Sequence, residues 1–497
     1  MRHAPSIGTL AHENGNAARH RGDAGYGHGV RVIHASAEVA PFSKTGGLGD
    51  VVGALPAAQA AYGHDVLVVS PWYPELGGVT PVKPMWIGDI DVPFAGGLEP
   101  VGVGTLERDG VLYAFVGHAD YSRPDPYGYP DDVRRFARFC RAVPPVAARL
   151  GFVPDLVHAH DWHAGLLPVL LERGWHLPAG FPGRPSVATV HNVQFQGVAP
   201  LAHLLHWARL PLELVGSHLE HEDRGNMLRA AVGFADLVTT VSPSYATELT
   251  EPGYGFGLDT TFRALGRRLA GILNGLDVRV WDPARDPHLE ATYDAADTSG
   301  KERCRSALLE ELGLDDGGPL LGVVSRLADQ KGIDLLLEAL PALLEQGWRL
   351  ALLGRGDAKL EAAARDAATA APEQVAVTLA HDEPLAHRVY AGSDALAVPS
   401  RFEPCGLSQM IAQRYGTLPL VRATGGLRDT VEHERDGFVF EEASAEELAL
   451  AAGNARGMWG TQAWRSMQQR AMAHDRSWRA SARDYLERYR EAIGEAP

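Results

Sequence analysis

Short runs of aliphatic and β-branched residues alternate with longer stretches of helical pattern along most of the 497-residue chain. Strands that are buried on both faces of a parallel sheet have such continuous apolar runs, and helices then form the crossovers between them. In the first half the predicted strands are Val30–Ala35, Asp65–Ser70, Leu112–Val116, Asp155–Ala159, Ser186–Val190 and Leu237–Val241. In the second half they are Leu320–Ser325, Arg349–Leu353, Val375–Leu379, Ala395–Val398 and Leu418–Val421. The sequence therefore predicts an α/β protein with two doubly wound sheets.

The pattern is interrupted between the two halves. Asp282–Pro287 contains two prolines, which disfavour both a helix interior and a central strand, and a polar helix is expected next, around Lys301–Leu312. We therefore expect two domains joined near residue 275. The segment Met1–Gly29 is rich in Gly, His, Ala and Arg and lacks the apolar core of a secretion signal, so we expect a mobile tail there.

Charge and cysteine content argue against several classes of protein. Lys and Arg number 46 and Asp and Glu number 62, which gives a net charge of −16. A strongly acidic chain is a poor partner for nucleic acid or an anionic membrane, and no run approaches the ~20 apolar residues of a membrane helix. The three cysteines, Cys140, Cys304 and Cys405, are too few and too scattered for a disulfide framework. We expect a cytoplasmic protein that binds neither nucleic acid nor membrane.

Ligands of doubly wound sheets bind outside the carboxyl ends of the strands, so the loops that follow strands are the places to search. The first such loop, Lys44–Val51, combines three glycines with a lysine ahead of a predicted helix. Its backbone N–H groups suit a phosphate or a sugar oxygen. A dinucleotide fingerprint is a weaker alternative, because the third glycine is absent and the second strand ends in Ser70-Pro71 rather than an acid. A purely structural turn is the other alternative.

Two further loops of the first half are rich in polar groups. His158–His163 holds three histidines and Asp161 directly after a strand. A metal site is one interpretation, but Trp162 separates the aspartate from the last histidine, and we favour a polar wall with packing histidines. His191 and Asn192 follow the next strand, and a histidine flanked by amides suits hydrogen bonding to a polyhydroxylated ligand. A structural histidine is the alternative.

The second half offers a site for an anion. Arg326 and Lys331 lie on the predicted turn from the first strand to its helix. Two cations beside a helix N-terminus match a diphosphate, whereas a solvated helix start is the alternative.

A carboxylate follows in a loop rich in proline and glycine. Glu403 lies within Pro399–Leu407, where one carboxylate among backbone donors suits contact with sugar hydroxyls, and the glycine-rich segment Thr424–Thr430 follows. Cys405 could act as a nucleophile, but no base is adjacent in the sequence, so we favour a small residue of the site wall.

In this order, the motifs resemble those of the bacterial glycogen synthase and plant starch synthase family, which extends α-1,4-glucans from a nucleotide-glucose donor. The resemblance runs from about Val30 to Tyr489. The matching segments are residues 44–50, 158–163, 189–192, 240–243, 271–277, 325–332, 400–407 and 414–416. Several motifs in fixed order are far more specific than any one of them alone.

The resemblance implies two Rossmann-like domains that face each other across a cleft, the GT-B-type glycosyltransferase fold. Residues 30–273 would form the domain on the acceptor side, and residues 274–470 would form the domain that binds the nucleotide sugar. Residues 471–497 would form a helix that crosses back to the first domain, and residues 1–29 would be the tail. Domain closure would use Gly271–Asp277 as its hinge.

The resemblance also implies the residues of the site. Those that would hold the diphosphate and the transferred glucose are Arg326, Lys331, Glu403, Gly406, Leu407, Thr424 and Gly425, with Cys405 in the wall. Those that would meet the donor, the glucose and the acceptor from the first domain are Lys44, Gly47, Asp161, His191 and Asn192. The residues expected to act in catalysis are Glu403, Arg326, Lys331 and His191.

The implied activity is retaining transfer of glucose from ADP-glucose to the non-reducing end of glycogen or another α-1,4-glucan. Because stabilising the leaving phosphate lowers the barrier, cations suffice, and we expect neither a metal nor a cofactor. A covalent mechanism would need a carboxylate beside the anomeric carbon, which the sequence does not identify. The alternatives are UDP-glucose as donor, maltose 1-phosphate as product, or a non-catalytic glucan-binding regulator on the same fold.

Overall fold

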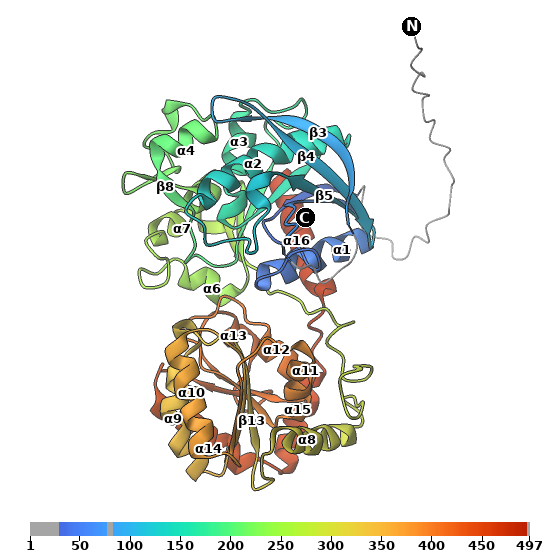
Figure 1. Cartoon of the computed structure of the whole chain (residues 1–497), viewed down its shortest axis with the longest axis vertical. Helices are drawn as coiled ribbons and strands as arrows, with labels where there is room; N and C mark the ends of the chain where they lie inside the picture. Colours follow the sequence, from blue (N-terminus) through green and yellow to red (C-terminus); the bar gives the residue numbers. More distant parts are fainter. Residues whose placement is uncertain (1–28, 77–82, 495–497) are drawn as a thin grey trace, which may run out of the picture.

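The computed structural model describes residues 29–76 and 83–494, which form two lobes stacked along the long axis of the molecule (Figure 1). The tail expected over Met1–Gly29 lies, apart from Gly29, outside the described residues. Within the described residues, no helix is long and apolar enough to cross a membrane. Each of the predicted strands is present, with ends that differ by at most one residue from those expected.

The first lobe is built on a nine-stranded sheet. Its strands, from one edge to the other, are β12 (Leu269–Gly271), β11 (Leu237–Thr240), β7 (Ser186–Val190), β6 (Leu156–His160), β1 (Arg31–Ala35), β2 (Asp65–Pro71), β5 (Val111–Gly117), β4 (Gly97–Arg108) and β3 (Met85–Phe94). The helices of this lobe are α1 (Gly47–Ala61), α2 (Asp132–Arg149), α3 (Leu167–Arg173), α4 (Leu201–Trp207), α5 (Met227–Phe234), α6 (Pro243–Glu248) and α7 (Asp259–Leu265). A small sheet of β8 (Val198–Pro200), β10 (Arg224–Asn226) and β9 (Glu220–His221) lies beside them.

The sequence did not predict the hairpin formed by β3 and β4. β3 pairs antiparallel with β4, and β4 pairs antiparallel with β5, so the sheet is mixed rather than wholly parallel. Most residues of β3 are exposed or half-buried, and the pairing is irregular between Trp86 and Asp89. An edge strand with a wet face lacks the continuous apolar run by which the buried strands were found.

The second lobe contains a six-stranded parallel sheet. Its strand order is β15 (Val375–Thr378), β14 (Arg349–Leu353), β13 (Leu320–Val324), β16 (Ala395–Val398), β17 (Leu418–Arg422) and β18 (Phe438–Phe440). The helices are α8 (Ser299–Leu312), α9 (Ile333–Glu345), α10 (Ala358–Ala370), α11 (Glu383–Gly392), α12 (Ser408–Arg414), α13 (Gly425–Thr430), α14 (Ala445–Met458) and α15 (Gln462–Met472). In chain order the strands read 3-2-1-4-5-6, the doubly wound arrangement in which ligands bind where the order reverses.

The last helix, α16 (Trp478–Ile493), leaves the second lobe and packs beside α1 on the sheet of the first lobe (Figure 1). Trp478, Tyr485 and Tyr489 are buried there in one apolar cluster with Val51 and Leu55 of α1. The C-terminal end of the chain therefore completes the hydrophobic core of the N-terminal lobe.

Candidate active site

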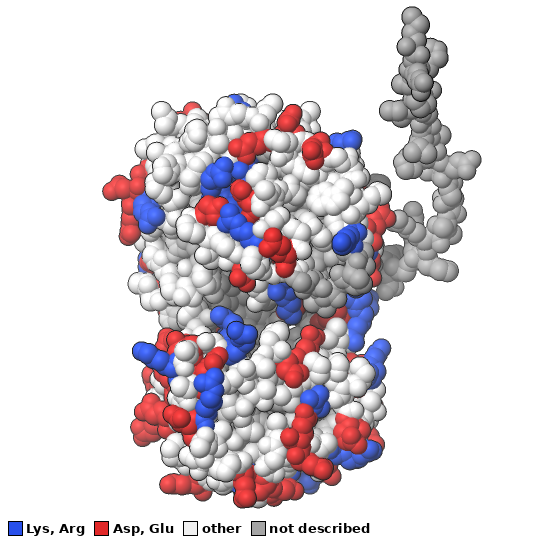
Figure 2. Space-filling model, in the orientation of Figure 1, with Lys and Arg blue, Asp and Glu red and all other residues white. Residues whose placement is uncertain are grey.

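A cavity of about 950 Å³ lies between the two lobes and is lined by residues of both. Its walls come from the loops that follow β1, β6 and β7 on one side and β13 and β16 on the other. In each sheet these loops flank the point where the strand order reverses, between β1 and β6 and between β13 and β16. In the space-filling view the molecule narrows between the lobes, and Lys and Arg side chains border this waist (Figure 2).

The loop that precedes α1 is held by a buried carboxylate. Glu38 accepts hydrogen bonds from the backbone N–H and the hydroxyl of Thr45, the latter at 2.7 Å, and from Tyr127 Oη at 2.7 Å. A Cβ added at Gly46 or Gly47 would meet nothing within 4 Å, so these positions leave open space beside the cavity. The absence of side chains there allows a ligand to approach the backbone closely.

Lys44 is not a free cation in this structure. Its Nζ lies 2.7 Å from Oδ1 of Asp50, and both residues line the cavity. A ligand anion that binds Lys44 would compete with this half-exposed ion pair.

Asp161 and His191 meet at the ends of β6 and β7. The backbone N–H of His191 donates to Oδ1 of Asp161 at 2.7 Å. Burial raises the pKa of Asp161 to about 7 and lowers the pKa of His191 to about 3, so the imidazole is neutral at pH 7. Asn192 lines the cavity next to them and, with Asp161 and His191, offers polar groups to a ligand.

The structure brings His34, which the sequence analysis did not single out, to two histidines of the His158–His163 motif. His34 of β1 joins His158 and His160 of β6, and one potential ligand atom of each lies within 4.8 Å of the others. The three rings are fully buried, and their nitrogen atoms are already hydrogen-bonded to one another or to neighbouring side chains. His163 lies apart from them and stacks against Tyr127. The cluster is thus a hydrogen-bonded group behind the wall of the cavity rather than an open set of metal ligands.

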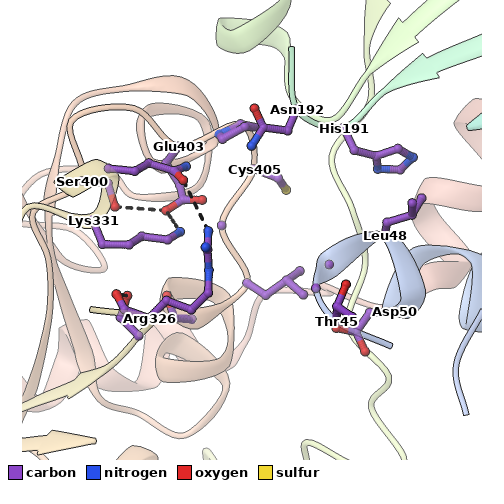
Figure 3. A pocket seen from close by; sticks show the side chains of 18 of the residues that line it. Thr45, Leu48, Asp50, His191, Asn192, Arg326, Lys331, Ser400, Glu403 and Cys405 are labelled. Atoms are coloured by element: carbon purple, nitrogen blue, oxygen red, sulfur yellow. Dashed lines mark hydrogen bonds and ion pairs between the residues drawn. The ribbon is translucent and has the colours of Figure 1, made fainter. Parts of the chain in front are cut away.

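On the opposite wall, Lys331 and Glu403 form an ion pair (Figure 3). Lys331 Nζ lies 2.5 Å from Oε2 of Glu403, and Ser400 Oγ donates to the same oxygen at 3.0 Å. Glu403 is buried, whereas Arg326 is exposed to the cavity and contacts Gln330 Oε1 at 3.4 Å. This wall therefore offers one largely unengaged guanidinium and one ammonium already paired with a carboxylate.

Cys405, Gly406 and Leu407 continue this wall. Burial raises the pKa of the Cys405 thiol to about 12, so the thiolate needed for a nucleophile is absent at neutral pH. Gly406 has a φ of +73°, a left-handed conformation that favours glycine, and it turns the chain into α12.

Thr424 and Gly425 do not occupy the place expected for them. Neither lines the cavity in the described part of the chain, and both donate to Oε1 of Glu248, from Thr424 Oγ1 at 3.0 Å and Gly425 N–H at 2.8 Å. A Cβ at Gly425 would lie 2.0 Å from the carbonyl oxygen of Glu403, and one at Gly426 would lie 2.1 Å from that of Cys405. These glycines pack against the back of the Glu403 loop and support it, because only hydrogen fits there.

Eleven of the thirteen expected site residues, all except Thr424 and Gly425, line this one cavity. Sequence reasoning missed Glu38, Tyr127 and His381, which line it as well. A signal existed for Glu38, which is an acid shortly after the first strand. Tyr127 and His381 lie in irregular segments without a recognisable motif.

The sequence of the chain is similar to those of known glycosyltransferases. Residues 31–264 match the family described as the starch synthase catalytic domain, and residues 305–453 match glycosyl transferases group 1. The chain is 47% identical to a glycogen synthase of Deinococcus deserti over 469 residues, covering 93% of this chain and all of the relative. It is 43% identical to one of Thermus thermophilus, covering 94% and all of the relative.

A solved structure has the same fold along nearly the whole chain. The catalytic domain of starch synthase IV from Arabidopsis thaliana, bound to ADP and acarbose, superposes with a TM-score of 0.86 at 33% identity and covers 94% of this chain and all of that chain. A sucrose-phosphate synthase from Thermosynechococcus elongatus shares the fold at 19% identity and a TM-score of 0.58. The chain therefore belongs to the glycogen synthase and starch synthase family and is a glucosyltransferase with the GT-B fold.

Proposed function

We propose that this glycogen synthase uses ADP-glucose as its donor and transfers the glucose, with retention, to the non-reducing end of an α-1,4-glucan. The observation that carries the proposal is the meeting of Arg326, Lys331 and Glu403 on one wall of a cavity whose other wall holds His191 (Figure 3). Asp161, whose carboxylate accepts from the His191 N–H, lines the same cavity. The ADP in the related starch synthase IV structure supports an adenine nucleotide as the leaving group. The three cysteines are free and buried, which fits a reducing cytoplasm.

In the proposed reaction, the bond between glucose and diphosphate breaks as negative charge grows on the phosphate. Arg326 and Lys331 stabilise this charge, and Lys331 can turn from Glu403 towards the phosphate as it does so. Glu403 then contacts the glucose, and the wall of Cys405, Gly406 and Leu407 encloses it. Thr424 and Gly425 act through the Glu403 loop rather than by touching the phosphates.

The acceptor hydroxyl attacks from the face that the diphosphate leaves, which retains the configuration. Carboxylates of the cavity are held by protein groups: Glu38 by Thr45, Asp50 by Lys44, Asp161 by the His191 N–H, and Glu403 by Lys331. A carboxylate whose oxygens are already engaged in an ion pair or in hydrogen bonds is a weaker covalent nucleophile, which supports direct transfer.

We also propose that residues 30–273 and 274–470 act as two domains that close on the substrates about a hinge at Gly271–Asp277. Closure removes water from the cavity and brings Lys44 and Gly47 towards the donor. Helix α16 would keep the second domain attached to the first.

The donor is tested by incubating the protein with glycogen and either ADP-glucose or UDP-glucose and measuring the nucleotide released. We expect ADP-glucose to give the higher kcat/KM. A preference for UDP-glucose would contradict the donor assignment while leaving the family unchanged. Replacing glycogen by glucose 1-phosphate in the same assay tests maltose 1-phosphate as the product, and turnover exceeding that with glycogen would contradict the acceptor assignment.

A further inference from the structure

A buried chain of hydrogen bonds runs from the cavity to the C-terminal helix. His191 Nε2 lies 3.0 Å from His160 Nδ1, and His160 Nε2 lies 3.0 Å from His34 Nδ1. His34 Nε2 then meets Gln59 Oε1 at 2.8 Å, and Gln59 Nε2 donates to Tyr489 Oη at 3.1 Å. This series of hydrogen bonds thus connects α16 and α1, through strands β1 and β6, to His191 in the wall of the cavity.

The three imidazoles of this chain are neutral at physiological pH. Burial lowers the pKa of His34 to about 4 and that of His191 to about 3, and it lowers the pKa of His160 well below the ordinary value. A neutral imidazole carries one N–H and one lone pair. Each hydrogen bond between two rings therefore contains one proton. Because each ring donates from one nitrogen and accepts at the other, all these hydrogen bonds must run in the same donor-to-acceptor direction.

The amide of Gln59 sets that direction. Its Oε1 can only accept, so His34 donates from Nε2 and accepts at Nδ1. His160 then donates from Nε2 to His34, and His191 donates from Nε2 to His160. His191 is left with a lone pair on Nδ1, for which no partner is found among the described residues.

Tyr489 holds the amide in this orientation. Its oxygen accepts from Gln59 Nε2, and its own proton is directed to His158 Nδ1 at 2.6 Å. His158 then donates from Nε2 to Thr189 Oγ1 at 2.5 Å. The proton positions along this side branch are therefore consistent with those along the hydrogen bonds from Gln59 to His191. Without the hydroxyl, the amide could rotate by half a turn and reverse each link.

We propose that Tyr489 and Gln59 are positioning residues that act through His34 and His160 to keep His191 in the Nε2–H tautomer. His191 thereby presents an unprotonated Nδ1 to the cavity as an acceptor for a hydroxyl of the sugar. The inference rests on the proposed function for the identity of the ligand, but the tautomer itself is a property of the free enzyme. It gives the C-terminal helix a role in the chemistry beyond packing.

The tautomer is measured directly in the free protein by a long-range proton–nitrogen correlation spectrum of histidine-labelled enzyme. The His191 signals are assigned by their loss in His191→Gln. We expect Nε2 to carry the proton and Nδ1 to be bare in the wild type. A protonated Nδ1 in the wild type would overturn the proposal, whatever the activity assays show.

Tyr489→Phe removes one hydroxyl and leaves the ring in place, and Tyr485→Phe is its matched control. Tyr485 is buried on the same helix, and its hydroxyl lies beside Thr189 and Thr239 at the end of the side branch, but it is hydrogen-bonded neither to Gln59 nor to a histidine of the hydrogen-bond series. In Tyr489→Phe we expect the His191 signals to show both tautomers, and in Tyr485→Phe only the original one. Gln59→Met, which removes both amide contacts at similar volume, should give the same mixture as Tyr489→Phe.

The activity should follow the tautomer. We expect kcat/KM to fall by about three- to tenfold in Tyr489→Phe and Gln59→Met, the effect of losing one hydrogen bond of ordinary strength, and to be unchanged in Tyr485→Phe. Unchanged spectra and rates in both test variants would overturn the proposal. If instead the wild type shows the expected tautomer but no transfer from ADP-glucose, the proposed donor fails and the hydrogen-bond direction stands.

Discussion

At the scale of single residues, the structure distinguishes two cations of the cavity wall, Arg326 and Lys331, that the sequence analysis treated alike. Lys331 is held by buried Glu403, whereas Arg326 is exposed to the cavity with one long contact to Gln330. Removing Lys331 leaves a buried carboxylate without its cation, a more costly change than the loss of a group that faces water.

We expect Arg326→Ala and Lys331→Ala each to lower kcat by about 10²–10³, because a contact that strengthens as charge develops on the phosphate is lost. Lys331→Ala should also lower the melting temperature, and Arg326→Ala should not. Steady-state kinetics with saturating donor and thermal unfolding measure the two effects. Arg365→Ala on α10, an exposed arginine paired with Glu361, is the control. Near wild-type kcat in both variants would place the diphosphate elsewhere.

Asp161 makes the stability of the free enzyme depend on pH. Its pKa is raised from 3.8 to about 7, mainly by burial. Between these values the folded protein holds a proton that the unfolded chain releases, so the stability contributed by this group is full below about pH 4 and is lost as the pH rises through about 7.

Asp161→Asn should remove this dependence. Between about pH 4.5 and pH 8, the unfolding free energy of the wild type should fall by on the order of 2 kcal/mol more than that of the variant. This is less than the full pKa shift of Asp161 implies, because solvent in the cavity reaches the side chain. Urea unfolding at the two pH values measures it. Asp366→Asn, exposed on α10, should change nothing. Parallel pH curves for wild type and Asp161→Asn would show that the carboxyl titrates normally.

At the scale of elements, the turn into α13 supports the Glu403 loop from behind. Gly426 donates its N–H to the carbonyl oxygen of Glu403 at 3.0 Å, and an added Cβ would lie 2.4 Å from Cys405 Cα. The turn therefore fixes the backbone on which Glu403 stands, although none of its atoms needs to touch a ligand.

Gly426→Ala should push the Glu403 loop out of place. We expect kcat to fall at least about tenfold and the unfolding free energy to fall by about 1–3 kcal/mol, as for other overpacked sites. Gly457→Ala is the matched control, since its Cβ on α14 would meet nothing within 4 Å. Steady-state kinetics measures kcat, and urea unfolding measures the unfolding free energy. If Gly426→Ala changes neither quantity, the Glu403 loop can adjust to the added methyl group.

The neighbouring strands β1 and β6 bring His34 directly opposite His158 in the register of the sheet. Because the ring nitrogens are hydrogen-bonded among themselves and to Gln59, Tyr489 and Thr189, we expect no metal to be needed. Dialysis against EDTA should therefore leave the rate unchanged. A large loss that Zn²⁺ or Mn²⁺ restores, with metal detected by mass spectrometry, would make the cluster a metal site.

At the scale of the whole molecule, the two lobes are joined by polar contacts as well as by the chain. Ser242 Oγ donates to the Pro404 carbonyl at 2.6 Å, Ser244 Oγ donates to Asp429 at 2.7 Å, and Glu248 caps the turn of Thr424 and Gly425. The helices α6 and α13 face each other at this seam (Figure 1).

The double variant Ser244→Ala/Glu248→Ala should loosen the seam, because it removes three hydrogen bonds between the lobes, each worth about 1 kcal/mol. We expect a larger radius of gyration in small-angle X-ray scattering and a higher KM for the donor. Ser306→Ala on α8, whose hydroxyl bonds within its own helix, is the control. Identical scattering curves would show that the remaining contacts hold the lobes together.

The sequence by itself determined the buried central strands, the two doubly wound sheets and eleven residues of the cavity wall. A buried parallel strand is recognisable in the sequence as a local run of apolar residues, and the ligand-binding loops at strand ends are recognisable as short motifs. The edge hairpin of β3 and β4 was not predicted, because its exposed face interrupts the apolar run.

Tertiary structure alone decided which motif residues face the ligand and which support them. Thr424 and Gly425 turn towards Glu248 and the back of the Glu403 loop, and His34 and Glu38 join groups many residues away. Such contacts depend on the direction of a side chain and on the packing of distant segments, such as Gln59 against Tyr489, 430 positions apart. No local pattern encodes them, because the same residue types at the same spacing are compatible with either arrangement until the lobes and the last helix have packed.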